Sequence, residues 1–135
     1  GENDAASMVR AAYEIARDRD VAAIAVFTMQ GRTAELASKT HPRVNILAFT
    51  PDELTYRRLA FMWGVEPHLV PFANTVEDML KQVDSAMLKS DKIKPGQQVA
   101  LLCGFPLGAM RTPNMALLHT VGSDISGVNG VDANK

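Results

Sequence analysis

The chain has 135 residues, of which 47% are hydrophobic and 21% charged, and its formal net charge is −1. This length and composition are typical of one soluble globular domain with a buried core. The near-neutral balance argues against a nucleic-acid-binding protein, which needs a basic face, and no apolar stretch is long enough to cross a membrane.

Cys103 is the single cysteine, so an intrachain disulfide is excluded. A lone thiol is typical of a protein in a reducing compartment, and we expect a cytoplasmic location or a plastid-like stroma. The N-terminus has neither the basic leader nor the apolar segment of a signal peptide. Because the chain begins with Gly rather than Met, we expect the natural protein to be longer.

The first elements alternate between helix and strand. Apolar residues recur at helical spacing over residues 4–18, which predicts an amphipathic helix. Residues 21–27 are apolar throughout, a pattern typical of a strand covered on both faces of a parallel sheet. A turn at residues 28–33 and a short helix over 33–39 follow. The dipeptide His41-Pro42 ends that helix, because a residue before proline avoids helical backbone angles.

The alternation then repeats with a strand at residues 44–49 and a second short helix. Thr50 is the expected N-cap of that helix, and Glu53 completes a capping box with it. We expect the helix to continue to Trp63, with the Trp63 side chain anchored in the core, and to stop at Gly64.

The second half of the chain continues this pattern. It predicts a strand at 67–70, a long amphipathic helix that begins near Thr75, and strands at 98–103 and 115–121, which the loop at 104–114 connects. Alternating strands and helices imply right-handed βαβ units and a parallel sheet with helices on both faces. The sequence therefore predicts an α/β fold, one domain over residues 1–122, and a mobile tail at 123–135.

Two segments follow predicted strands, where ligands of open parallel sheets bind. The turn at residues 28–33 combines hydroxyl groups, a glycine and the N–H groups of a helix start, which could hold an anion such as phosphate. The alternative is an ordinary capped turn. The loop at residues 104–114 is long for a hairpin, which favours a function, and the alternative is a flexible connection.

Other residue patterns give no catalytic or metal site. The nucleotide-binding motifs G-x-x-x-x-G-K-[ST] and G-x-G-x-x-G are absent, and no acid–base–nucleophile set is present. Cys103 ends an apolar strand and is expected to be a buried, inert thiol, while Arg57 and Arg58 are expected to form a solvated face. The three histidines lie on different elements without the spacing of metal ligands: His41, His68 and His119.

Six short blocks follow one another in an order and spacing shared with a known family. The blocks are Ala25-Val26-Phe27-Thr28 with Gly31-Arg32-Thr33-Ala34, then His41-Pro42-Arg43, Ile46 to Pro51, Arg58 to Pro67, Lys94-Pro95-Gly96, and Gly104 to Gly108 with Thr112-Pro113-Asn114. Together they resemble the C-terminal domain of pyruvate kinase. The resemblance covers about residues 7–122, nearly the whole chain.

The resemblance implies a three-layer α/β/α fold with a five-stranded, mostly parallel sheet whose last strand is antiparallel. It implies a regulatory and oligomerisation domain of a glycolytic enzyme whose separate (β/α)₈ barrel transfers phosphoryl from phosphoenolpyruvate to ADP, using Mg²⁺ and K⁺. This chain would then have no catalytic residue and hold no metal or cofactor. Its implied partners are the barrel, the other subunits of a tetramer, and a phosphorylated sugar as effector.

By position, the resemblance also implies the residues of an effector-phosphate pocket: Thr28, Gln30, Gly31, Arg32, Thr33, Phe105, Gly108 and Arg111. Gln30 replaces a small hydroxyl residue of the family, and Met29 stands where some sugar-bisphosphate-responsive members have Lys. Arg111 could add a bidentate phosphate contact. These departures leave open a domain with only an assembly role, which pairs through residues 115–121. A further alternative is a free-standing small-molecule sensor or enzyme with this fold, although the lack of an acid–base–nucleophile set argues against an enzyme.

Overall fold

The structure is a computed structural model and describes residues 2–103 and 115–123. The expected loop at 104–114 lies outside these residues, as does the expected tail from residue 124 onward. The described elements, in chain order, are α1 (Glu2–Asp18), β1 (Ala23–Phe27), α2 (Arg32–Lys39), β2 (Ile46–Thr50), α3 (Glu53–Leu59), β3 (Val65–Leu69), α4 (Val76–Lys89), β4 (Gln98–Cys103) and β5 (Met115–Thr120).

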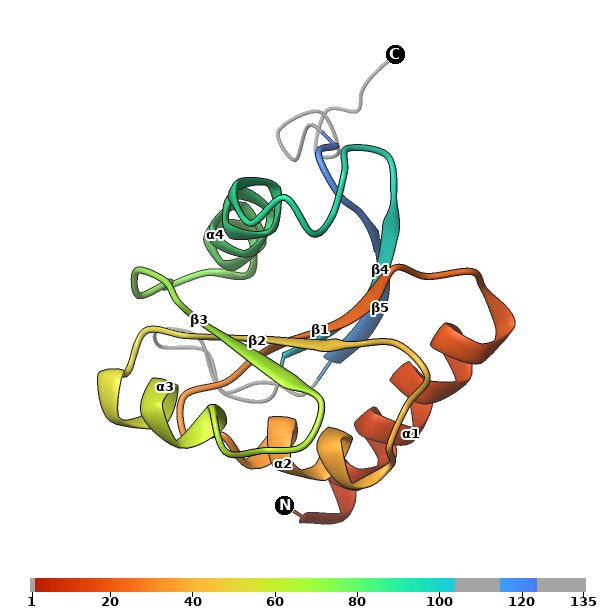
Figure 1. Cartoon of the computed structure of the whole chain (residues 1–135), viewed down its shortest axis with the longest axis vertical. Coiled ribbons are helices and arrows are strands. Elements are labelled where there is room, and N and C mark those ends of the chain that lie inside the picture. Colours follow the sequence, from red (N-terminus) through yellow and green to blue (C-terminus); the bar gives the residue numbers. More distant parts are fainter. Residues whose placement is uncertain (1, 104–114, 124–135) are drawn as a thin grey trace.

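The five strands form one sheet in the order β3-β2-β1-β4-β5. The pairs β3–β2, β2–β1 and β1–β4 are parallel, and β5 is antiparallel to β4. Figure 1 shows α4 on one face of this sheet and α1, α2 and α3 on the other. The predicted three-layer α/β fold, with its antiparallel last strand, is therefore confirmed.

The uninterrupted apolar runs of β1 and β2 are explained by burial on both faces, since all five residues of each strand are buried. Successive side chains of a strand point to opposite faces. Phe27 accordingly packs in the core on the α4 side, with Met79 and Val83, whereas Val26 packs on the other side, with Ala12 of α1. Each face of the sheet thus has its own hydrophobic core.

The strand order creates a switch point between β1 and β4. After β1 the chain adds β2 and β3 on one side, and α4 then carries it across to β4 on the other side of β1. Phe27 and Cys103, the last residues of β1 and β4, are direct neighbours in the ladder. Ligands of open α/β sheets bind at such a point, beyond the carboxyl ends of the strands.

The start of α3 differs from the prediction, which placed the N-cap at Thr50. Asp52 is the N-cap, and its side chain accepts a hydrogen bond from the Thr55 N–H at 2.9 Å. Thr50 is instead the last residue of β2, and its carbonyl accepts from the Val70 N–H at 3.0 Å. Its backbone belongs to the sheet, so the cap moves two residues along the chain.

The end of α3 was also predicted wrongly. The helix ends at Leu59, which is 0% exposed, and not at Trp63, which is 57% exposed. Leu59 is thus the core anchor that we had expected Trp63 to be. The Trp63 ring packs against His41 at a centroid distance of 4.1 Å, and Gly64 takes a left-handed φ of 69° in the turn before β3.

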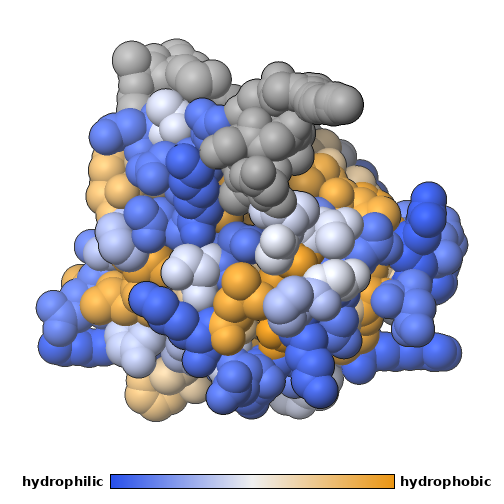
Figure 2. All heavy atoms as spheres, turned by 90° about the horizontal axis from the view of Figure 1, so that it is seen from above, coloured by the Kyte–Doolittle hydropathy of each residue, from blue (hydrophilic) through white to orange (hydrophobic). Residues whose placement is uncertain are grey.

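The molecular surface is mixed in polarity. Seen from above the view of Figure 1, the surface is mainly hydrophilic, with hydrophobic patches between polar residues (Figure 2). Among the described residues, the large hydrophobic side chains that are exposed belong to α3, β3 and the segments beside them: Leu54, Phe61, Trp63, Leu69 and Phe72. In the same part of the chain, no helix is long and apolar enough to cross a membrane.

Candidate functional site

The turn between β1 and α2 is shaped by Gly31. This residue is the N-cap of α2 and has φ 88° and ψ −4°, a left-handed conformation that glycine adopts without the steric cost of a side chain. Its N–H donates to the buried hydroxyl of Thr28 at 2.9 Å. The turn therefore closes on itself and leads directly into the first turn of α2.

The first turn of α2 has no side-chain cap. The two other helix starts described at side-chain level are capped: Asp52 accepts from a backbone N–H in α3, and Thr75 does so in α4. At α2 the cap residue is a glycine and no side-chain cap hydrogen bond forms. The N–H groups and the positive end of the helix dipole at this point suit an anion.

Thr33 lies in this uncapped turn and has an unusual environment. The residue is 4% exposed, yet within residues 2–103 and 115–123 the structure shows no hydrogen bond to its hydroxyl. The other buried polar side chains in those residues all have a partner: Thr28, Ser38, Thr50, Thr55, Asp84 and His119. A buried hydroxyl without a partner is costly, so Thr33 requires an explanation.

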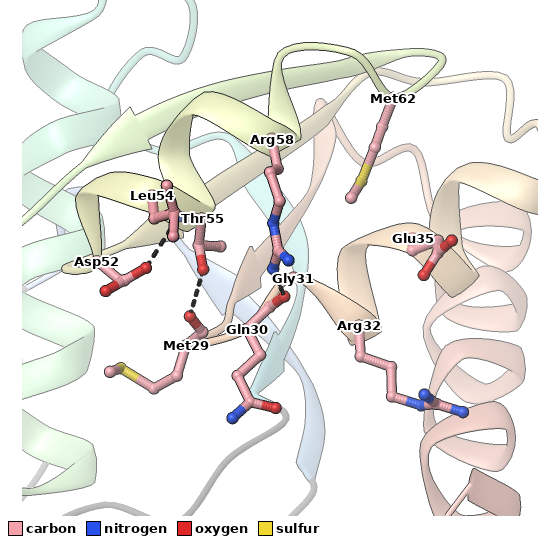
Figure 3. Close-up of a pocket in the computed structure, with 10 residues that line it drawn as sticks. All are labelled: Met29, Gln30, Gly31, Arg32, Glu35, Asp52, Leu54, Thr55, Arg58 and Met62. Atoms are coloured by element: carbon pink, nitrogen blue, oxygen red, sulfur yellow. Dashed lines mark hydrogen bonds between the residues drawn. The ribbon is translucent and has the colours of Figure 1, made fainter.

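A cavity of about 730 Å³ opens on the side of the turn that faces α3 (Figure 3). Two side chains of α3 bond the backbone of the turn here. The Thr55 hydroxyl donates to the Met29 carbonyl at 2.7 Å, and the Arg58 guanidinium donates to the Gln30 carbonyl at 2.5 Å. The Met29 and Gln30 side chains extend away from α3 (Figure 3), and Met29 packs against the core on the α4 side.

The residues that line the cavity carry both signs of charge: Arg32 and Arg58 are basic, and Glu35 and Asp52 are acidic. The pKa of Asp52 lies below its ordinary value of 3.8. The main cause is the hydrogen bond from the Thr55 backbone N–H, with smaller contributions from the Thr55 side chain and the Arg58 charge. Asp52 is therefore ionised at neutral pH and remains an acceptor for the start of α3.

Five of the eight residues predicted for the pocket lie together in this turn: Thr28, Gln30, Gly31, Arg32 and Thr33. The other three, Phe105, Gly108 and Arg111, lie outside the described residues. Thr55 was not predicted for the site, and Arg58 was expected on a solvated face with Arg57. Arg57 does form a surface ion pair with Glu53 at 3.1 Å, but Arg58 bonds the turn.

The three histidines each have a structural contact. His41 packs on Trp63, His68 bonds Glu66 at 2.8 Å, and His119 bonds Asp84 at 2.8 Å. Cys103 is buried, as predicted. Over the described part of the chain, no group of three or more His, Cys, Asp or Glu side chains is placed to hold a metal ion.

Comparison with known proteins decides the family. The profile of the family described as "Pyruvate kinase, alpha/beta domain" matches residues 6–119, most of the chain. The chain belongs to this family. The predicted resemblance to the C-terminal domain of pyruvate kinase is thereby confirmed, and the five-stranded sheet with four helices agrees with it.

Similar curated proteins carry the same family name. The chain is 33% identical over 112 residues to the pyruvate kinase of Geobacillus stearothermophilus, 32% over 113 residues to that of Corynebacterium glutamicum, and 35% over 112 residues to that of Staphylococcus haemolyticus. These matches cover 83–84% of the chain but only 19–24% of each relative. The pyruvate kinase α/β domain described here thus spans about a fifth of the proteins it resembles.

Proposed function

We propose that this pyruvate kinase α/β domain binds a phosphorylated small molecule at the start of α2 and acts as the regulatory domain of a pyruvate kinase. The uncapped first turn of α2, with the unpartnered, buried Thr33 hydroxyl beside it, carries the proposal. Thr33 would donate its hydroxyl hydrogen to a phosphate oxygen, which satisfies a group that has no hydrogen bond among the described residues.

The proposed phosphate contacts follow from the local backbone. An incoming dianion would accept hydrogen bonds from the N–H groups of the first turn of α2 and gain from the helix dipole. Gly31 contributes through its left-handed backbone, which leads the chain directly into the first turn of α2. Arg32, the first residue of α2, adds positive charge on the same turn. The rest of the ligand would determine which phosphorylated compound is preferred.

The enzymatic reaction would take place outside this chain. The relatives are pyruvate kinases about four to five times longer than the matched segment. We therefore assign phosphoryl transfer from phosphoenolpyruvate to ADP, and the Mg²⁺ and K⁺ it needs, to a barrel domain of the same protein. Ligand binding here would change activity there by a coupling free energy of about 1–3 kcal/mol, the usual range for allosteric effects.

An assembly role is favoured by the position of β5. Within the described residues β5 pairs only with β4, so it forms an edge of the sheet, and an exposed edge can pair with a second chain. The opposite edge, β3, contains Pro67, which lacks the N–H that a continuous ladder needs. We propose that two copies pair antiparallel through β5 as part of a homotetramer.

Calorimetry of the 135-residue chain tests ligand binding. Inorganic phosphate, glucose 6-phosphate, fructose 1,6-bisphosphate and AMP would be titrated in turn, with unphosphorylated glucose as the control. We expect heat of binding from at least one phosphorylated compound and none from glucose. No response to any phosphorylated compound would refute the effector role, although the family assignment would stand.

Light scattering over a range of concentrations tests the assembly role separately. We expect the apparent mass to rise from that of one 14.6 kDa chain to that of a dimer as the concentration increases. A constant monomer mass at the highest concentrations would count against pairing through β5.

A further inference from the structure

We propose that Thr55 and Arg58 of α3 are positioning residues that hold the β1–α2 turn in the conformation able to bind an anion. The inference deepens the proposed function and rests on it for the identity of the site. It concerns the side of the turn that faces α3. The two residues lie 26 and 28 positions along the sequence from the residues they contact, so α3 holds a turn that is distant in the sequence but adjacent in space.

The first contact is made by Thr55 and is buried. The residue is 3% exposed, and its hydroxyl donates to the Met29 carbonyl at 2.7 Å. The backbone of Thr55 is itself fixed, because its N–H donates to the N-cap side chain of Asp52 at 2.9 Å. The backbone of Thr55 is thus fixed at the start of α3, and its hydroxyl fixes the Met29 carbonyl in the β1–α2 turn.

The second contact is made by Arg58, one helical turn further along α3. Its guanidinium donates to the Gln30 carbonyl at 2.5 Å and passes within 3.8 Å of the point where a Cβ on Gly31 would lie. A hydrogen bond from a charged donor is stronger than one between neutral groups. Figure 3 shows Arg58 extending from α3 directly onto this part of the turn.

The geometry of the peptide bond converts these two contacts into an orientation of the turn. In a trans peptide the C=O and the following N–H point in opposite directions. With the Met29 and Gln30 carbonyls turned toward α3, the N–H groups of Gln30 and Gly31 point away from it. The Gly31 N–H then meets the Thr28 hydroxyl, which closes the turn in front of the uncapped α2.

Amide hydrogen exchange of the unliganded chain tests the bracing directly. The variants are Thr55→Val, which keeps the shape but not the hydroxyl, and Arg58→Met. The conservative variants Thr55→Ser and Arg58→Lys restore a donor, and Arg57→Met is the matched control because Arg57 bonds only Glu53 in the described structure. We expect Thr55→Val and Arg58→Met each to speed exchange of the Gly31 amide about tenfold, as the loss of one hydrogen bond predicts.

The pattern across variants separates positioning from general destabilisation. Both conservative variants should restore most of the Gly31 protection that Thr55→Val and Arg58→Met lose, whereas Arg57→Met should leave that protection unchanged. Unchanged Gly31 exchange in both Thr55→Val and Arg58→Met would overturn the proposal, as would equal acceleration in Arg57→Met.

Calorimetric titration with inorganic phosphate completes the test. We expect about tenfold weaker phosphate binding by Thr55→Val and Arg58→Met than by the native chain, with Arg57→Met within about twofold. Faster Gly31 exchange with undiminished phosphate affinity would overturn the link to the site. If the native chain binds no phosphorylated compound, the proposed function fails, and the exchange pattern alone then decides whether α3 braces the turn.

Discussion

Asp84 of α4 is a buried carboxylate that joins this helix to the end of β5. Its Oδ1 accepts from His119 Nε2 at 2.8 Å, and the Gly122 N–H donates to the two carboxylate oxygens at 2.9 and 3.1 Å. The Asp84 and His119 residues are 8% and 7% exposed. Replacing Asp84 therefore tests how much of the fold depends on one polar bridge between a helix and the edge strand.

The expected loss follows from the two donors that lose their acceptor. A buried donor without a partner costs about 1–3 kcal/mol, so Asp84→Ala should lower the free energy of unfolding by about 2–6 kcal/mol. That is a large part of the roughly 5–15 kcal/mol that stabilises a typical domain. Urea denaturation should show the midpoint falling by about 1–3 M for a domain of this size.

Two comparisons make the Asp84 result interpretable. Asp20→Ala replaces an exposed aspartate and should change the unfolding free energy by less than about 0.5 kcal/mol. Because Asp84 and His119 share one interaction, the losses of Asp84→Ala and His119→Ala should fall short of additivity in the double variant. A loss below about 1 kcal/mol for Asp84→Ala, or full additivity, would show that the buried Asp84 bridge does not stabilise the fold as its hydrogen bonds predict.

Three further predictions concern stability. Gly31→Ala should lower the free energy of unfolding, measured by urea denaturation, by roughly 1–2 kcal/mol, because φ is 88° at this position. A variant as stable as the native chain would show that the turn does not require a left-handed glycine. Leu59→Ala should lower the free energy of unfolding by about 2–5 kcal/mol, whereas Trp63→Ala should lower it by less than about 1 kcal/mol. The reverse order would contradict the assignment of Leu59 as the core anchor. Burial raises the pKa of Glu66, but the hydrogen bond from Lys92 and the neighbouring charges outweigh burial and hold this pKa below its ordinary 4.5. The ionised form is therefore favoured by folding, so its stabilisation is present above pH 4.5 and is lost as the pH falls through the lower folded pKa. Lys92→Met should reduce that acid-side loss in denaturation series at several pH values, and an unchanged pH dependence would count against the ion pair.

Most of the fold could be predicted because the apolar patterns of its central strands are unambiguous. Residues 23–27 and 46–50 are buried on both faces, which is the condition that produces uninterrupted apolar runs. The strand order could not be predicted from local sequence patterns, because it depends on the side of β1 to which α4 carries the chain after β3. Errors arose where one residue had two structural uses: Thr50 resembles a helix cap, but its backbone is part of the sheet.

The sequence predicted the turn of the candidate site but not the two side chains of α3 that contact it. Thr28 and Gly31 were identifiable because a hydroxyl and a glycine after a buried strand are typical of a turn that binds anions. Thr55 and Arg58 were not, because their contacts depend on how α3 packs beside a turn that is distant in the sequence. The unpartnered Thr33 hydroxyl is likewise a property of packing, since the sequence shows only a threonine near a helix start.

The most direct test of the account is a comparison of the native chain with Thr33→Val. Valine has the same shape without the hydroxyl, so the variant removes a buried polar group that has no partner in the described structure. We predict that the unliganded variant unfolds at the same or a higher temperature, while its affinity for the best phosphorylated compound falls about 10–100-fold, the loss expected for a hydrogen bond to a charged group. A variant that is less stable but binds as tightly as the native chain would show that Thr33 serves the fold and not a ligand, and would contradict the proposed site.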